Sequence, residues 1–126
     1  MAIRLLVAED HSSLRDNLVT YLSGFGIQCA PAESVPEALR MVDEQTVDGV
    51  MVDLLLQGRL SLPVINRAFE HDVPVLIHTA FDRKAVLRKI GPAFSRCTMV
   101  QKPHELSSLR SRIVNMVRKG QVAHGG

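Results

Sequence analysis

The segment Gly49-Val50-Met51-Val52-Asp53-Leu54 decides the fold class, because an unbroken apolar run ends in a single carboxylate. A strand with one solvent-exposed face alternates apolar and polar residues. A continuous apolar run instead indicates a parallel sheet that is covered on both faces. The sequence therefore predicts a buried strand here, and Asp53 stands at its carboxyl end.

Segments of strand length and segments of helical spacing alternate along the chain on both sides of this strand. The other predicted strands are 3–8, about 27–31, 74–79 and 98–101. The predicted helix starts are Ser12 or Ser13, Ser34, Ser61 and Asp82, each a residue type that caps helices, and a last helix follows Pro103. Five strand–helix units predict an α/β domain with a five-stranded parallel sheet and helices on both faces.

The length and composition favour one domain. The chain has 126 residues, of which 46% are hydrophobic and 22% charged, which is typical of a folded domain. We expect the domain to span residues 1–119 and residues 120–126 to form a flexible tail. No signal peptide or membrane-spanning run is evident, and Met1 favours a complete protein. Cys29 and Cys97 lie far apart and predict free thiols in a reducing compartment, the cytoplasm.

The net charge of +2 conceals a strong asymmetry. Residues 1–82 carry 5 basic and 12 acidic side chains, for a net charge of −7. Residues 83–126 carry 10 basic and 1 acidic side chain, for a net charge of +9. Aromatic residues make up only 4% of the chain, so base stacking is poorly supported. The basic part of the chain could bind an acidic protein partner, or it could be a solvated face with no partner, and the sequence leaves both interpretations open.

Polar residues gather where the predicted strands end. Glu9 and Asp10 follow the first strand, Asp53 the third, Thr79 the fourth and Lys102 the fifth. The carboxyl ends of parallel strands meet at one edge of the sheet. Three carboxylates there would repel one another unless a cation joined them, and oxygen ligands favour Mg²⁺ or Mn²⁺. A hydroxyl and an ammonium beside them suit the binding of a phosphoryl group.

These residues resemble those of the receiver domain of bacterial two-component response regulators. The acidic pair Glu9-Asp10, then Asp53, Thr79-Ala80 and Lys102-Pro103 each close a strand in order, and the resemblance extends from Ile3 to about Lys119. It implies the flavodoxin-like (βα)5 fold, doubly wound with strand order 2-1-3-4-5. It also implies signal transduction by a phosphoaspartate, within a two-component system or phosphorelay.

The resemblance assigns a role to each residue. Asp53 would be the phosphoacceptor, Asp10 the direct Mg²⁺ ligand and Glu9 a ligand through water. The backbone carbonyl of Leu55 would be a further metal ligand. Thr79 would donate a hydrogen bond to the phosphoryl group. Such a protein catalyses only its own phosphorylation and dephosphorylation, and it is not a turnover enzyme.

Lys102 would pair with the phosphoryl group, and the Lys102–Pro103 bond is expected to be cis. Three neighbouring positions depart from the family pattern. Met99 stands where an aromatic switch residue is usual, which leaves a ring-based switch in doubt. Leu55 and Phe81 are apolar where many members carry polar residues that orient water, so we expect slow autodephosphorylation. The segment 57–60 also lacks the usual Pro-Gly pattern.

The resemblance implies a stand-alone response regulator whose output is a protein contact. Its expected partners are a sensor histidine kinase or histidine phosphotransfer protein, and a downstream target. The face formed by the fourth helix, fifth strand and fifth helix would contact the target. This face is basic, with Arg83, Lys84, Arg88, Lys89, Arg110 and Arg112. It therefore suits an acidic target and disfavours a symmetric dimer.

Two other functions compete with this interpretation. A Mg²⁺-dependent aspartyl-phosphate phosphatase shares the topology, but it usually needs an acid two residues after the nucleophile, where Leu55 stands. A phosphate-independent interaction module would keep the fold without the complete set of polar residues. Nucleic-acid binding through the basic third of the chain is a weaker alternative.

Overall fold

A five-stranded parallel sheet organises the protein, as the sequence predicts. The structure is a computed structural model that describes the backbone of residues 2–125 and the side chains of residues 2–121. The strands of the sheet are β1 (Ile3–Ala8), β2 (Ile27–Ala32), β3 (Gly49–Val52), β6 (Val75–Thr79) and β7 (Thr98–Gln101). Their spatial order is β2-β1-β3-β6-β7, and every neighbouring pair is parallel. Strands β4 (Leu55–Leu56) and β5 (Arg59–Leu60) belong to a separate small sheet. If only the five strands of the main sheet are numbered along the chain, their order is 2-1-3-4-5, as in a doubly wound, flavodoxin-like fold.

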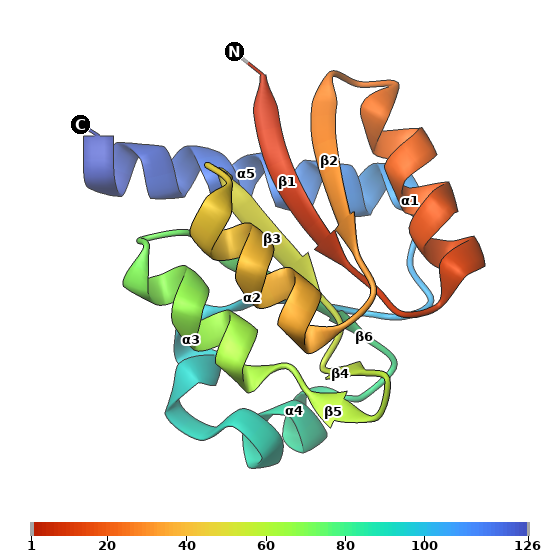
Figure 1. Ribbon diagram of the computed structural model, residues 1–126, viewed down its shortest axis with the longest axis vertical. Helices are drawn as coiled ribbons and strands as arrows, with labels where there is room; N and C mark the ends of the chain where they lie inside the picture. The colour runs from red at the N-terminus through yellow and green to blue at the C-terminus, as the bar shows by residue number, and fades with distance from the viewer. Residues whose placement is uncertain (1, 126) are drawn as a thin grey trace.

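Helices cover both faces of the sheet. They are α1 (Ser12–Ser23), α2 (Val35–Glu44), α3 (Leu62–Glu70), α4 (Arg83–Ile90) and α5 (Leu106–Gly125), and a short 3-10 helix, η1 (Gly91–Arg96), follows α4. Figure 1 shows α2 and α3 in front of the sheet and α5 behind it. Each face of the sheet is thus shielded from water, which explains why the strands lack polar alternation.

Successive residues of the strands face two separate cores, because side chains alternate across a sheet. Leu5, Val7 and Met51 pack with the inner sides of α1 and α5. Leu6 and Val50 pack with α2, α3 and α4 on the other face. All five side chains are buried, so the strand ends are held rigidly from both sides.

The helix starts agree with the sequence in part. Ser34 Oγ accepts a hydrogen bond from Glu37 N at 3.2 Å, and Asp82 Oδ1 accepts one from Ala85 N at 2.8 Å. The prediction for the first helix was wrong, since its cap is His11 rather than Ser12 or Ser13. His11 is the last residue with extended backbone, and its Nδ1 accepts from Leu14 N at 3.4 Å.

Two segments have structure that the sequence alone did not indicate. The segment 57–60, which lacks the usual Pro-Gly pattern, belongs to a small antiparallel hairpin formed by β4 and β5. Helix α5 extends to Gly125, and the flexible tail expected over residues 120–126 stays a prediction. A Cβ atom at Gly120 would lie 3.2 Å from the Pro74 side chain, so the helix packs closely on the domain at this residue. Gly126 lies outside the described residues.

Across the described chain, none of the helices combines the length and apolar character needed to cross a bilayer.

Candidate phosphoryl-acceptor site

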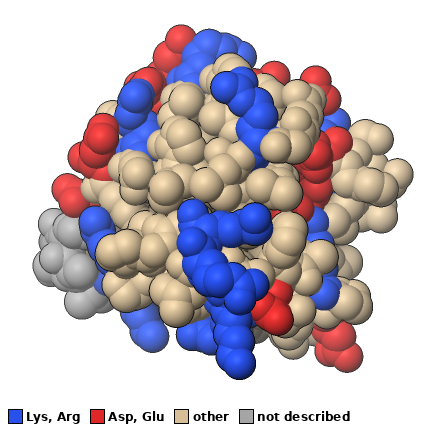
Figure 2. Space-filling view, turned by 90° about the horizontal axis from the view of Figure 1, so that it is seen from below, with Lys and Arg blue, Asp and Glu red and all other residues tan. Residues whose placement is uncertain are grey.

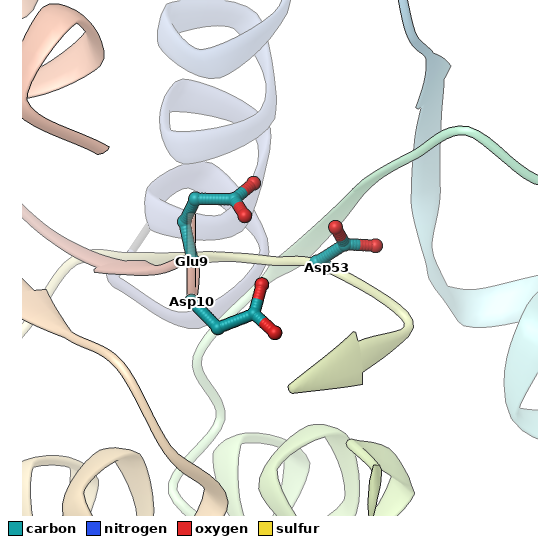
Figure 3. Close-up of side chains that lie close together, drawn as sticks. All are labelled: Glu9, Asp10 and Asp53. Atoms are coloured by element: carbon teal, nitrogen blue, oxygen red, sulfur yellow. The ribbon is translucent and has the colours of Figure 1, made fainter. Parts of the chain in front are cut away.

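Strand pairing brings the predicted carboxylates together. Ala8 of β1 pairs with Val52 of β3, so the residues that follow them leave the sheet side by side. The backbone N–H of Asp53 donates to the carbonyl of Ala8 at 3.1 Å. One carboxylate oxygen from each of Glu9, Asp10 and Asp53 lies within 4.8 Å of the others, and Figure 3 shows these side chains around a common space. The structure therefore places the three predicted acids in one pocket.

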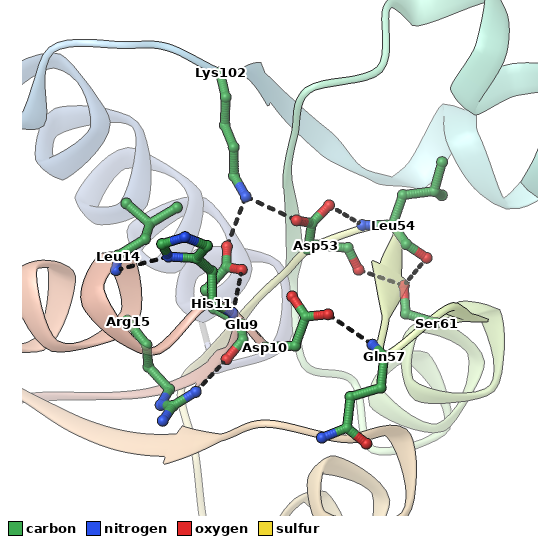
Figure 4. Close-up of polar contacts among 10 residues, drawn as sticks. All are labelled: Glu9, Asp10, His11, Leu14, Arg15, Asp53, Leu54, Gln57, Ser61 and Lys102. Atoms are coloured by element: carbon green, nitrogen blue, oxygen red, sulfur yellow. Dashed lines mark hydrogen bonds and ion pairs between the residues drawn. The ribbon is translucent and has the colours of Figure 1, made fainter.

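Lys102 completes the cluster from the end of β7. Its Nζ donates to Glu9 Oε1 at 2.6 Å and to Asp53 Oδ2 at 2.7 Å (Figure 4). Burial opposes the charged form of Lys102, but the hydrogen bonds and negative charges of Asp53 and Glu9 outweigh it and raise its pKa. The ammonium group thus bridges two carboxylates that would otherwise repel each other.

Backbone and side-chain donors fix the orientation of the acids. Leu54 N donates to Asp53 Oδ1 at 2.7 Å, and His11 N donates to Glu9 Oε2 at 3.0 Å. The Arg15 guanidinium donates to the backbone carbonyl of Glu9 at 2.7 Å. The carboxylates are therefore held before any ligand arrives, as a preorganised site requires.

Ser61 supports the pocket in a way that the sequence did not reveal. It precedes α3, where a side-chain cap was expected, but its hydroxyl makes no capping bond. The buried Oγ donates instead toward the carbonyls of Asp53 at 2.7 Å and Leu54 at 3.0 Å. Ser61 consequently ties the start of α3 to the backbone that carries the central carboxylate.

Thr79, at the end of β6, has an unused hydroxyl. The residue is fully buried, and its Oγ1 has no hydrogen-bond partner among the described residues. A buried polar group without a partner is unfavourable. Lys102 N donates to the Thr79 carbonyl at 2.7 Å, so the residue lies beside Lys102 and its hydroxyl is open to a ligand that reaches this edge of the sheet.

Replacing Thr79 with Val is expected to raise the free energy of unfolding by about 1 kcal/mol, because Val keeps the shape and removes the unsatisfied hydroxyl. Urea unfolding measures this change. Thr79→Ser is the matched control, since it keeps the hydroxyl and loses only a methyl group. A Val variant that is less stable than the wild type would show that the hydroxyl has a partner in solution.

The positions that depart from the family pattern include Met99 and Phe81, which pack with the core on the α2, α3 and α4 side of the sheet. Met99 is buried in β7, and its backbone carbonyl accepts from Arg112 Nη2 at 3.0 Å. Phe81 is half-buried, with Lys89 Nζ 5.6 Å from its ring centroid. The Lys102–Pro103 bond is cis, as the family resemblance implies.

His78 lies beside the pocket, although the sequence analysis gave it no role. Burial lowers its pKa to about 4, the charge of Lys102 adds to this shift, and Asp53 opposes it. His78, Glu9 and Asp53 lie around a space too small to hold a water molecule. The His78 imidazole is therefore neutral near pH 7, and among the described residues Lys102 is the cation that pairs with the carboxylates of Glu9 and Asp53.

Comparisons with known proteins agree with this geometry. Residues 5–114 match the response regulator receiver domain. The sensory transduction protein RegX3 of Mycobacterium tuberculosis is 30% identical over 117 residues, which is 92% of this chain and 51% of RegX3. PhoB of Klebsiella pneumoniae, a phosphate regulon transcriptional regulatory protein, is 28% identical over 123 residues, which is 94% of this chain and 53% of PhoB. This chain thus spans about half the length of these relatives.

Solved structures agree on the fold. A CheY-like receiver domain from Methanospirillum hungatei superimposes with a TM-score of 0.87 at 14% identity, covering 98% of this chain and 99% of the other. The receiver domain of a LuxO repressor protein from Vibrio parahaemolyticus gives a TM-score of 0.84 at 17% identity, covering 98% and 95%.

The doubly wound fold and the acidic pocket at its strand ends define a class of signalling domain that binds Mg²⁺ and phosphoryl groups. Within that class, the chain belongs to the response regulator receiver domain family. Receiver domains act in two-component signalling, where they interact with histidine kinases and with downstream effectors.

Proposed function

We propose that Asp53 accepts a phosphoryl group from a histidine kinase or a histidine phosphotransfer protein. The observation that carries the proposal is the bridge from Lys102 to Asp53 and Glu9. Thr79 lies beside Lys102 at the end of β6, and its hydroxyl has no partner among the described residues. A carboxylate oxygen of Asp53 forms a bond to phosphorus while the bond from phosphorus to the donor nitrogen breaks. The electron pair of the broken bond stays on the donor ring nitrogen, and because the other ring nitrogen of the donor carries a proton, the imidazole leaves as a neutral molecule. Lys102 and Thr79 then hold phosphoryl oxygens.

The acidic cluster fits Mg²⁺, because its donors are hard carboxylate oxygens that converge on one space. We propose that Asp10 and Asp53 bind the ion directly, that Glu9 binds it through water, and that the Leu55 carbonyl is a further ligand. Mn²⁺ suits the same donors. When bound, the cation neutralises charge on the transferring phosphoryl group.

The domain is proposed to be a phosphoacceptor that dephosphorylates slowly and not a turnover enzyme. Leu55 and Phe81 flank the acceptor and have no polar group with which to orient an attacking water molecule. The lack of an acid at Leu55 also disfavours a phosphatase. A phosphate-independent interaction module is less consistent with a preorganised pocket that includes a bridging ammonium group.

The output is proposed to be contact with an acidic protein. The face expected to be basic comprises Arg83, Lys84, Arg88, Lys89, Arg110 and Arg112. Arg112 points to β7, where it donates to the Met99 carbonyl, but Arg110 lies over the Phe25 ring at the end of α1 and so falls outside this face. Among the side chains that the structure describes, these six form no ion pair with a carboxylate. Figure 2 looks at the end of the molecule where α4 lies and shows Lys and Arg side chains gathered near its centre. Such a surface repels its own copy, which favours a monomer.

We also propose a cytoplasmic setting, in which a kinase or phosphotransfer partner would meet the domain. Cys29 and Cys97 are both free thiols, as is usual in a reducing compartment. Burial raises the pKa of Cys97 to about 12, so this thiol stays protonated and unreactive.

Replacing Asp53 with Asn is expected to abolish phosphorylation, since the amide cannot act as the nucleophile. Wild type and variant are incubated with Mg²⁺ and a small phosphodonor such as acetyl phosphate, and intact mass is recorded over time. The wild type should gain one phosphoryl group, lose it slowly after donor removal, and gain none when Mg²⁺ is chelated. An adduct on the Asn variant would contradict the assignment of Asp53, and donor turnover without an adduct would favour the phosphatase.

A further inference from the structure

We propose that the backbone amide of Gln57 is a positioning group that holds Asp10 in the orientation needed to bind a divalent cation. The inference rests on the proposed role of Asp10 in Mg²⁺ binding. Its direct observation is a hydrogen bond of 2.7 Å from Gln57 N to Asp10 Oδ2, which joins residues 47 positions apart (Figure 4).

The β4–β5 hairpin presents this amide. Leu55 pairs with Leu60 and Leu56 with Arg59, which leaves Gln57 and Gly58 as a two-residue turn. Both turn residues have positive φ angles, 52° and 77°, as in the tight turns that join twisted strands. The N–H of Gln57 therefore points away from the hairpin ladder and toward the end of β1.

The base of the hairpin is fixed to the acceptor strand. Leu54 and Leu56 are fully buried. Ser61 N donates to the Leu54 carbonyl at 2.8 Å, and the Ser61 hydroxyl reaches the Asp53 carbonyl. Because both ends of the hairpin are anchored, its tip holds the Gln57 amide at a set position relative to Asp53.

Asp10 needs such a donor more than its neighbours do. Glu9 is buried and paired with Lys102, and Asp53 is bonded to Lys102 and to Leu54 N, but Asp10 is exposed. Repulsion from the other two carboxylates would favour rotamers of Asp10 that point into solvent. The Gln57 amide holds Oδ2 and leaves Oδ1 available to a cation. Donors of this kind to metal ligands typically change metal affinity about 10- to 100-fold.

The proposal requires the amide of residue 57 and a positive φ angle, but not the Gln side chain. Figure 4 shows that side chain pointing away from the carboxylates. Glycine meets both requirements. Proline meets neither, because it has no N–H group and its φ angle is fixed near −65°.

The experiment compares Mg²⁺ dissociation constants, measured by calorimetry, for the wild type, Gln57→Gly and Gln57→Pro. We expect the Gly variant to stay within about twofold of the wild type and the Pro variant to bind roughly 10-fold or more weakly. Equal affinity of the Pro and wild-type proteins, or a loss in the Gly variant as large as in the Pro variant, would overturn the proposal. If the wild type binds no Mg²⁺, or if Asp10→Asn leaves its affinity unchanged, the proposed function fails instead.

Because proline also changes the turn, a second measurement uses the unaltered chain. The Gln57 amide is followed by nuclear magnetic resonance through its proton shift and hydrogen exchange. We expect protection of this amide without Mg²⁺, its persistence when Mg²⁺ saturates the site, and its loss in Asp10→Ala. Release of the amide on Mg²⁺ binding would show that it only replaces the ion, and would overturn the proposal.

Discussion

Replacing Lys102 with Met is expected to lower the free energy of unfolding by about 3 kcal/mol near pH 7 without Mg²⁺, because removing one partner of a buried ion pair leaves the other charge uncompensated. The Glu9 side chain is only 4% exposed and that of Asp53 only 15%, and both contact the Lys102 ammonium group. Met fills a similar volume but supplies no charge. The two carboxylates would then face each other across a partly desolvated pocket.

Urea unfolding in the presence of a chelator measures this loss, and a second series with Mg²⁺ tests its electrostatic origin. We expect Mg²⁺ to restore more stability to Lys102→Met than to the wild type, because the cation supplies the missing positive charge. The matched control adds Glu9→Gln to Lys102→Met, which removes one of the repelling charges and should recover part of the stability. A loss that neither Mg²⁺ nor Glu9→Gln reduces would indicate altered packing rather than unpaired charge.

The fold was predictable because its main signals are local. The unbroken run before Asp53 indicates a strand buried on both faces, and Ser34 and Asp82 mark helix starts by their own side chains. The grouping of Glu9, Asp53 and Lys102 was predictable as well, since parallel strands end at one edge and each of these residues directly follows a strand.

The remaining features depend on contacts between distant segments. The bond from Gln57 N to Asp10 forms only when the hairpin lies against the end of β1. The bonds from the Ser61 hydroxyl form only when the hairpin folds back onto the residues that follow β3. Nothing local indicates that Ser61 supports the pocket rather than capping α3. His78 likewise resembles any histidine in a strand, and its altered pKa arises from burial and from Lys102, which is 24 positions later in the chain.

The protein is expected to lose stability as the pH falls from 6.5 toward 4, and His78 should cause a large part of the loss. Its pKa is about 4 in the folded protein, against an ordinary value of 6.5. Between these values the unfolded chain binds a proton that the folded protein does not, so the free energy of unfolding falls as pH falls. A shift of this size corresponds to roughly 3 kcal/mol. Above pH 6.5 both states are neutral at this residue, and the contribution is fully present.

Urea unfolding of the wild type and of His78→Met between pH 4 and pH 7 isolates this effect. Met has no titrating group, so any change in packing shifts its stability by the same amount at every pH. The difference in unfolding free energy between the two proteins should therefore change by up to about 3 kcal/mol across the range, in favour of the variant at low pH. The carboxylates titrate in both proteins and largely cancel in this difference. A difference that stays constant with pH would mean that His78 remains as easily protonated in the folded protein as in the unfolded chain. Solvent would then reach the imidazole between β6 and the acceptor pocket.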